Sequence, residues 1–250
     1  MPILSFADHR AKRAEGRMSL TGLRQQVLEA NLELVRRGLV LFTFGNVSGI
    51  SRSEGLVAIK PSGVAYEGMT PVDMVITDLE GRVVEGELRP SSDLPTHLEL
   101  YNRFPTIGGV AHTHSEFATA WAQAQLAIPC FGTTHADYFH GSVPVTACLA
   151  PDEIASNYER NTGIAICRLF EHLNPDDVPA ALVAGHGPFC WGSSATGAAH
   201  IALILEAVAR MAYYTVGISA HAAPISRELH SKHFLRKHGA NAYYGQVSRK

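Results

Sequence analysis

The chain has 250 residues, a formal net charge of -2 at pH 7 and 46% hydrophobic residues. This composition is typical of a globular protein with a sizeable core, and it excludes a disordered or fibrous chain. The near-neutral charge provides no basic field that would attract nucleic acid, so we expect no nucleic-acid partner. A local site for a small anionic substrate remains compatible with this charge.

Cysteine usage and apolar patterning indicate the compartment. The four cysteines are widely spaced and form no C-x-x-C pair. Such cysteines are typical of buried thiols in a reducing compartment. The N-terminus is polar and lacks an apolar signal core, and we find no uninterrupted apolar stretch long enough to span a bilayer. We therefore expect a cytoplasmic protein with no membrane partner.

The first elements follow a short N-terminal segment. Residues 1–19 carry mixed charge and little periodicity, and we interpret them as a flexible extension before a single domain at 20–250. From Thr21 the apolar spacing predicts a helix that Gly38 ends. "GLVAI" predicts a strand, and the Lys-Pro-Ser-Gly sequence after it predicts a turn.

A hairpin signal decides the class of sheet. Residues 73–87, "DMVITDLEGRVVEGE", predict two strands joined around Glu80 and Gly81. A hairpin introduces antiparallel pairing and argues against a purely parallel, doubly wound fold. We therefore predict one α/β domain with a central mixed, largely antiparallel sheet covered by helices on both faces.

The remaining elements alternate between helices and buried strands. A helix is predicted in 91–104, with Ser92 or Asp93 as its N-cap. We then expect a strand at 106–112 and a helix at 115–124. The final predictions are one long helix at 150–173, two strands around a glycine-flanked histidine at 179–192, and a long apolar helix at 193–217.

Three histidines suggest a metal site. His112 and His114, in "GGVAHTHSEF", stand two residues apart, so in a strand both rings project from one face. His186 lies between two glycines after another apolar strand. Neutral imidazoles at the ends of neighbouring strands can meet at one divalent ion and leave a position for substrate. The alternative is that strand-end histidines simply reach solvent.

Three further stretches suit a phosphate. "KPSG" at 60–63 and "SSD" at 91–93 combine small hydroxyls with backbone N–H groups, and the first adds a lysine. "FGNVSG" at 44–49 has the same character, with Asn46 as its natural donor. Each stretch alone is also explained as an ordinary turn or helix cap.

Two segments near the C-terminal half suggest proton transfer and assembly. Asp137 lies in a partly apolar loop, "GTTHADYFHG", where a raised pKa would suit a general acid or base, although a loop cap is the simpler role. The tail "HFLRKHGANAYYGQ" carries Tyr243 and Tyr244 after a cluster of cations and imidazoles. It is either solvated or folded over a neighbouring subunit.

Seven of these motifs occur together in one order: "GNVS", "IKPSGV", "PSSDLPTH", "GGVAHTHS", "GTTHADYF", "HGPFCWG" and "LRKHGANAYYGQ". In this arrangement, from about Leu20 to Gln246, the chain resembles the class II aldolase/adducin family. The resemblance implies the class II aldolase fold. It also implies a homotetramer with four-fold symmetry and sites between subunits, which gives the unusual tail a role.

The resemblance assigns roles residue by residue. His112, His114 and His186 are implied ligands of a catalytic Zn²⁺, with Asp93 beside the ion as a further ligand and catalytic group. Mn²⁺ or Co²⁺ suits the same imidazoles. Asp137 is implied as one acid/base and Tyr244, from the adjacent subunit, as the other. The implied substrate-binding residues are Asn46, Lys60, Ser62, Gly63, Ser91, Ser92, Thr133 and Arg236.

The same resemblance implies an activity. The family's aldolase branch has a glutamate base where this chain has Asp93, so the aspartate favours the epimerase branch. The implied reaction is metal-dependent interconversion of L-ribulose 5-phosphate and D-xylulose 5-phosphate by cleavage and re-formation of the C3–C4 bond. An aldolase acting on another sugar phosphate and a non-catalytic adducin-like scaffold are the alternatives. The native metal, the pathway served and the role of Glu116 stay open.

Overall fold

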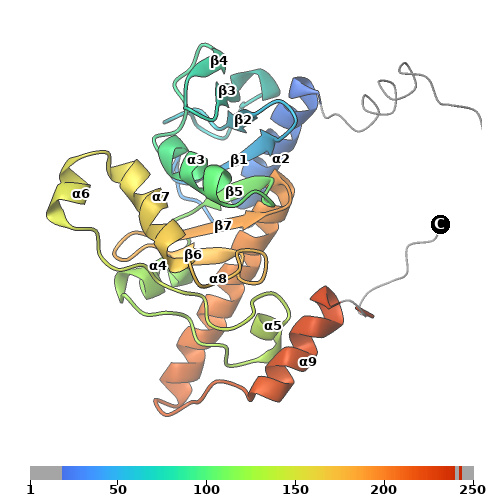
Figure 1. The fold of residues 1–250 in the computed structure, drawn as a ribbon, viewed down its shortest axis with the longest axis vertical. Helices are drawn as coiled ribbons and strands as arrows, with labels where there is room; N and C mark the ends of the chain where they lie inside the picture. The colour runs from blue at the N-terminus through green and yellow to red at the C-terminus, as the bar shows by residue number, and fades with distance from the viewer. Residues whose placement is uncertain (1–18, 240–241, 244–250) are drawn as a thin grey trace, which may run out of the picture.

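The computed structural model describes residues 19–239 and 242–243, which form a seven-stranded sheet packed between helices (Figure 1). The strands are β1 (Asn46–Ser51), β2 (Leu56–Ile59), β3 (Val75–Asp78), β4 (Val83–Glu85), β5 (Gly109–His112), β6 (Ala180–Leu182) and β7 (Pro188–Gly192). The helices are α2 (Leu20–Arg36), α3 (Leu94–Arg103), α4 (Glu116–Gln123), α5 (Thr133–Ala136), α6 (Pro151–Ala155), α7 (Tyr158–Leu169), α8 (Ala195–Ile218) and α9 (Arg227–His238), with a 3-10 helix η1 (Pro71–Asp73).

The sheet has the order β4-β3-β2-β1-β5-β7-β6, and each neighbouring pair of strands is antiparallel. The predicted hairpin is β3–β4, and Gly81 takes the positive φ that its turn requires. Parallel pairing is present at one isolated bridge between Val145 and Leu182. The prediction of a largely antiparallel sheet is confirmed.

Helices cover both faces of the sheet, as predicted. On one face, Gly49 of β1 lies against Val27 of α2 and Ala195 of α8. On the other face, the Ser48 hydroxyl forms hydrogen bonds with His97 and Tyr101 of α3, at 2.7 and 2.8 Å. The helix α7 packs on α3 and completes this second layer. Because side chains alternate along a strand, Asn46 lies on the same face as Ser48.

The helix α8 is a core helix for part of its length. It packs against β5, β7 and α2 and buries eight residues, most of them alanine. By length and composition α8 is apolar enough to cross a membrane, although Glu206 and Arg210 interrupt its apolar run. Because α8 packs on the sheet in a layered α/β core, it needs an apolar composition there as well.

The single long helix predicted at 150–173 is wrong. The structure has two helices, α6 and α7, separated at Ser156 and Asn157. Asn157 has φ 51°, in the left-handed region that ends a helix, and asparagine adopts this conformation more readily than most residues. After the break, Tyr158 and Glu159 at the start of α7 are partly buried.

Two predictions fall partly on residues outside the described ranges. The described chain begins at Ser19, whose side chain accepts a hydrogen bond from the Gly22 amide and caps α2. Residues 1–18 of the predicted extension and Tyr244 lie outside the described residues, so the boundary of the domain stays a prediction.

Close backbone packing explains the "GGV" sequence before the histidines. The Gly108 amide donates to the Gly192 carbonyl at 2.7 Å, and a Cβ on Gly109 would overlap the backbone of Ser194 and Ala195. Glycine therefore lets the start of α8 lie directly on β5.

We expect Gly109→Ala to destabilise the fold by about 3 kcal/mol or more, because backbone atoms at the start of α8 must move to admit the methyl group. Urea unfolding measures the loss. Gly217→Ala is the matched control, since a Cβ at Gly217 on α8 meets open space and alanine favours a helix by about 1 kcal/mol. Equal unfolding midpoints for the Gly109→Ala variant and the unmodified chain would contradict the packing.

A candidate metal centre and substrate pocket

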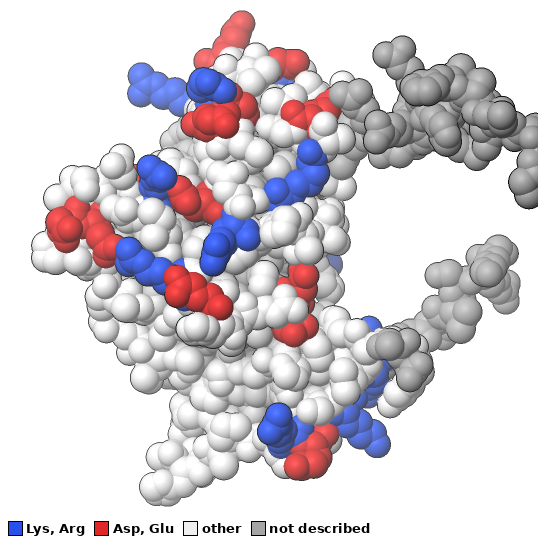
Figure 2. Space-filling model, viewed as in Figure 1, with Lys and Arg blue, Asp and Glu red and all other residues white. Residues whose placement is uncertain are grey.

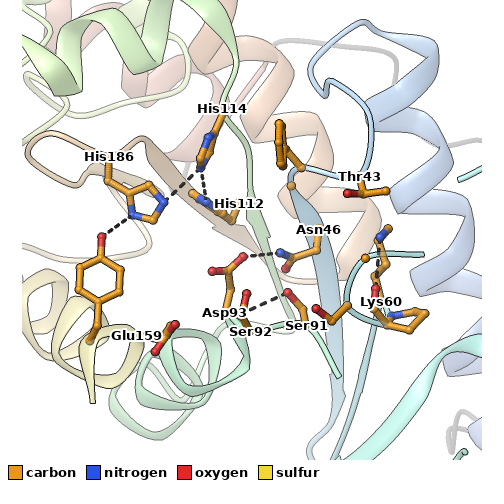
Figure 3. Close-up of a pocket in the computed structure, with 16 residues that line it drawn as sticks. Thr43, Asn46, Lys60, Ser91, Ser92, Asp93, His112, His114, Glu159 and His186 are labelled. Carbon is orange, nitrogen blue, oxygen red and sulfur yellow. Dashed lines mark hydrogen bonds between the residues drawn. The ribbon is translucent and has the colours of Figure 1, made fainter. Parts of the chain in front are cut away.

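Three histidine rings meet at the edge of the second helical layer (Figure 3). His112 is the last residue of β5, His114 lies between β5 and α4, and His186 lies in the turn between β6 and β7. The Nε2 atom of His114 is 3.1 Å from Nε2 of His112 and 3.1 Å from Nε2 of His186. The three histidines predicted from the sequence therefore converge through the same ring nitrogen.

The strand register explains part of this convergence. His112 pairs with Asn46 on β1 and with Phe189 on β7, and its ring stacks on Phe189 with centroids 4.1 Å apart. The His112 Nδ1 donates to the Pro188 carbonyl at 2.9 Å. Since a carbonyl only accepts, Nδ1 carries the ring proton and Nε2 keeps a free lone pair.

The donor set fits a divalent cation. Nitrogens that bind one ion at about 2.0–2.1 Å lie roughly 3 Å apart, as His114 Nε2 does from Nε2 of His112 and of His186. Burial, with smaller contributions from His112 and His114, lowers the pKa of His186 to about 4. Burial also lowers the pKa of His114. Both shifts favour the neutral imidazoles that a metal requires.

Asp93 lies beside the histidines at the start of α3. It occupies the N-cap position without a side-chain capping bond, and its Oδ2 instead accepts a hydrogen bond from Asn46 Nδ2 at 2.7 Å. Burial alone would raise the pKa of Asp93, but the neighbouring His112 and His97 and the Asn46 bond hold it below its ordinary value. A carboxylate is therefore held ionised beside the three histidines.

A pocket of about 400 Å³ opens in front of this centre. Its lining includes Thr43, Phe44, Gly45, Asn46, Lys60, Pro61, Ser62, Gly63, Ser91, Ser92, Asp93, His112, His114, Tyr158, Glu159 and His186. Two backbone hydrogen bonds, from Ser62 N to the Arg89 carbonyl and from Ser91 N to the Lys60 carbonyl, hold the two serine loops side by side. The predicted phosphate-binding stretches thus share one pocket with the metal candidates.

Lys60 lines the pocket, yet its ammonium group is already engaged. The side chain is buried, and Nζ donates to the carbonyls of Val64 at 2.7 Å and Pro61 at 3.2 Å. Nζ also lies 4.7 Å from the centre of the Tyr66 ring. Burial lowers the pKa of Lys60 to about 8. In this structure Lys60 shapes the loop that carries Ser62 and Gly63.

The second group of predicted residues lies apart from this pocket. Thr133 begins α5, Asp137 follows that helix, and Arg236 lies on α9; none of the three lines the pocket. Figure 1 shows α5 and α9 together at the opposite end of the molecule from β3 and β4. Within one chain, Thr133, Asp137 and Arg236 therefore lie apart from the histidine pocket.

Asp137 joins α9 to the loop at 132–141. Arg236 donates to both carboxylate oxygens, at 3.1 and 2.7 Å, and His233 Nδ1 donates at 3.0 Å. The expected raised pKa is wrong. Burial would raise it, but the hydrogen bonds from Arg236 and His233 and the charge of Lys237 hold the pKa of Asp137 below its ordinary value.

Several residues at the site carry no sequence signal. Tyr158 and Glu159 reach the pocket because α7 begins at Tyr158, and the expectation of one continuous helix concealed that position.

Glu206 of α8 accepts hydrogen bonds from the amides of Phe117 and Ala118 at 2.8 and 2.9 Å and caps α4, 89 and 88 residues away in sequence. Glu116 itself is exposed in the first turn of α4.

Residues 25–213 match the family described as Class II Aldolase and Adducin N-terminal domain. The chain belongs to this family. The matched segment contains the three histidines, both serine loops and Asp93, and the predicted family resemblance is therefore confirmed.

Relatives within this family include L-ribulose-5-phosphate 4-epimerases. The chain is 56% identical over 224 residues to the enzymes named L-ribulose-5-phosphate 4-epimerase UlaF from Salmonella paratyphi B and Salmonella typhi, covering 90% of this chain and 98% of each relative. Among solved structures, an L-fuculose 1-phosphate aldolase has a TM-score of 0.74 at 24% identity, covering 87% of this chain and 97% of that one. The L-fuculose-1-phosphate aldolase of Thermus thermophilus has a TM-score of 0.64 at 24% identity, with coverage of 81% and 98%. These two structural likenesses show the class II aldolase fold.

Proposed function

We propose that this chain is a metal-dependent L-ribulose-5-phosphate 4-epimerase that interconverts L-ribulose 5-phosphate and D-xylulose 5-phosphate. The observation that carries the proposal is one pocket in which three histidine Nε2 atoms face two serine loops. The identity of 56% with L-ribulose-5-phosphate 4-epimerases over nearly their whole length supports the same substrate.

The chemistry of the substrate explains why such a pocket is needed. In a 2-keto pentose 5-phosphate the C4 hydrogen is not α to the carbonyl, so enolisation cannot invert C4. Breaking the C3–C4 bond and forming it again on the other face of the aldehyde inverts C4. A bound divalent ion supplies Lewis-acid stabilisation of the negative charge that develops on the substrate oxygens.

The residues of the pocket divide into two groups. His112, His114 and His186 would hold the ion, with Asp93 beside them, and we favour Zn²⁺, with Mn²⁺ or Co²⁺ as substitutes. The loops with Ser62, Gly63, Ser91 and Ser92 would bind the phosphate through hydroxyl and amide groups. Asn46, held by Asp93, would orient the substrate between the two. Gripping the phosphate keeps the aldehyde fragment in place while it rotates.

Two further acid/base groups of the proposed reaction are not among the described residues that line this pocket. We assign one acid/base role to Asp137 and the other to Tyr244, both reaching the pocket from the adjacent subunit of a homotetramer. The lowered pKa of Asp137 keeps the carboxylate ionised, as a base for the C4 hydroxyl proton requires. Thr133 and Arg236, close to Asp137, would approach the substrate on the same side.

The surface supports assembly of several copies. Met211, Tyr213, Tyr214 and Ile218 of α8 are exposed, with Ile218 at 88%. The region of the molecule that contains the far end of α8 in Figure 1 carries few charged side chains in Figure 2. An apolar face of this kind is typical of a subunit interface. Four free cysteines accord with a cytoplasmic enzyme.

The test is an assay of metal-loaded protein on L-ribulose 5-phosphate, with D-xylulose 5-phosphate followed through a coupled enzyme. We expect turnover that disappears after chelation and returns when Zn²⁺ or Mn²⁺ is added. Release of glycolaldehyde phosphate without epimerised product would instead identify an aldolase. Absence of both turnover and bound metal would overturn the proposed function and favour a scaffold.

A further inference from the structure

His186 differs from the other two histidines in how its ring is supported. It lies in a turn between Gly185, with φ 71°, and Gly187, and the His186 amide donates to the Val183 carbonyl at 3.0 Å. The His112 ring is fixed by the Pro188 carbonyl and by stacking on Phe189. The Nδ1 atom of His186 is instead contacted by a residue outside the β6–β7 turn.

Tyr158 provides this contact. Its hydroxyl oxygen lies 3.3 Å from Nδ1 of His186, whereas the Nε2 atom of the same ring faces His114. Tyr158 is half-buried and lines the pocket. When Nε2 binds an ion, Nδ1 carries the ring proton, and the phenol oxygen is the acceptor within reach.

The position of Tyr158 is itself well defined. It is the first residue of α7, directly after the left-handed Asn157, and its carbonyl accepts a hydrogen bond from Thr162 Oγ1 at 2.9 Å. Asn161 of α7 donates to the carbonyls of Glu153 and Ser156, which ties the preceding turn to the helix. Because α7 packs along α3, which begins beside Asp93, Tyr158 links the second helical layer to the β6–β7 turn.

We propose that Tyr158 is a positioning residue for the third metal ligand: its hydroxyl accepts the Nδ1 proton of His186 and holds Nε2 towards the ion. The inference rests on the metal centre in the proposed function. In this proposal, the break between α6 and α7 makes Tyr158 the first residue of α7, where its hydroxyl contacts His186 in the β6–β7 turn.

The test is Tyr158→Phe, which keeps the ring and removes the acceptor. We expect zinc affinity of the full chain, measured by competition with a chromophoric chelator, to weaken about 10- to 100-fold. The visible spectrum of the Co²⁺-loaded variant should change as well. Tyr213→Phe is the matched control, since Tyr213 is exposed on α8 and packs its ring against Phe117; its zinc affinity should equal that of the unmodified chain.

A double-mutant cycle separates positioning from a general loosening of the fold. In a His186→Asn background, the residual zinc affinity is measured by titration with excess Zn²⁺, and Tyr158→Phe should weaken it no further, because the ring that Tyr158 orients is gone. An equal loss in both backgrounds, or unchanged affinity of Tyr158→Phe in the native background, would overturn the inference and leave the proposed function intact. Absence of zinc binding by the unmodified chain would instead contradict the metal centre itself.

Discussion

Replacement of His114 by asparagine is expected to abolish stoichiometric metal binding and to lower kcat/KM about a thousandfold, while the fold is retained. His114 is the most exposed of the three histidines and lies between β5 and α4, so its removal leaves the core intact. Its Nε2 is the atom that contacts Nε2 of both other rings at 3.1 Å. Loss of about 4 kcal/mol of Lewis-acid stabilisation corresponds to this reduction in rate.

Metal content per subunit, determined by elemental analysis after dialysis, is the primary measurement, and kcat/KM on L-ribulose 5-phosphate is the second. His172→Asn is the control, because His172 is an exposed histidine in the turn that follows α7. It should match the unmodified chain in both measurements. Full activity of His114→Asn with an undiminished metal content would show that the histidine cluster does not hold the catalytic ion.

Local sequence signals predicted most of the fold because the physical rules behind them act over short distances. The apolar spacing from Leu23 to Leu34 predicted α2, and Gly38, with φ 67°, follows its end as expected. The pair Glu80 and Gly81 predicted the β3–β4 hairpin. The break between α6 and α7 was missed because Asn157 looks like an ordinary helix residue until its φ is known.

The candidate site was predictable to the extent that it is built from short motifs. His112 and His114 are neighbours in sequence, and the serine loops are each a few residues long. That His186 joins them depends on the pairing of β5 with β7, which places Phe189 opposite His112. No local rule specifies that pairing, and at this point family resemblance rather than periodicity united the three histidines.

No local sequence pattern predicts contacts between elements that are far apart in the chain. The ion pair of Asp137 with Arg236 joins residues 99 positions apart, and it reversed the expected direction of the Asp137 pKa shift. The apolar neighbours in the sequence suggested desolvation alone, whereas the fold supplies a guanidinium group. The separation of Asp137 from the histidine pocket likewise follows from tertiary structure.

The separation of Asp137 from the histidine pocket leads to a second prediction with a large effect. It tests whether two subunits contribute residues to each active site. Asp137→Asn alone is expected to lower kcat about a hundredfold or more, because the base proposed for the C4 hydroxyl proton is lost. His114→Asn alone is expected to remove the metal. If each site combines the histidine pocket of one subunit with Asp137 of its neighbour, a tetramer that contains both variants regains intact sites.

Random pairing of the two variants fixes the fraction of intact sites that the mixture should contain. In tetramers reassembled from equal amounts of the two inactive variants, about a quarter of the interfaces pair an intact histidine pocket with an intact Asp137. Activity per site should therefore rise to about a quarter of that of the unmodified enzyme. Mixing His114→Asn with His186→Asn is the control and should restore nothing, since every pocket then lacks a ligand.

The result expected from mixing does not depend on which function of Asp137 the single variant loses. Asp137 anchors α9 through Arg236 and His233, so Asp137→Asn loosens that helix as well as removing a carboxylate. In the mixed tetramer the His114→Asn subunit supplies an intact Asp137 and an intact α9, while the Asp137→Asn subunit supplies only its pocket. Activity recovers whether proton transfer or docking of α9 was lost. No recovery from tetramers shown by mass to contain both variants would mean that each subunit works alone and that Asp137 acts only within its own chain.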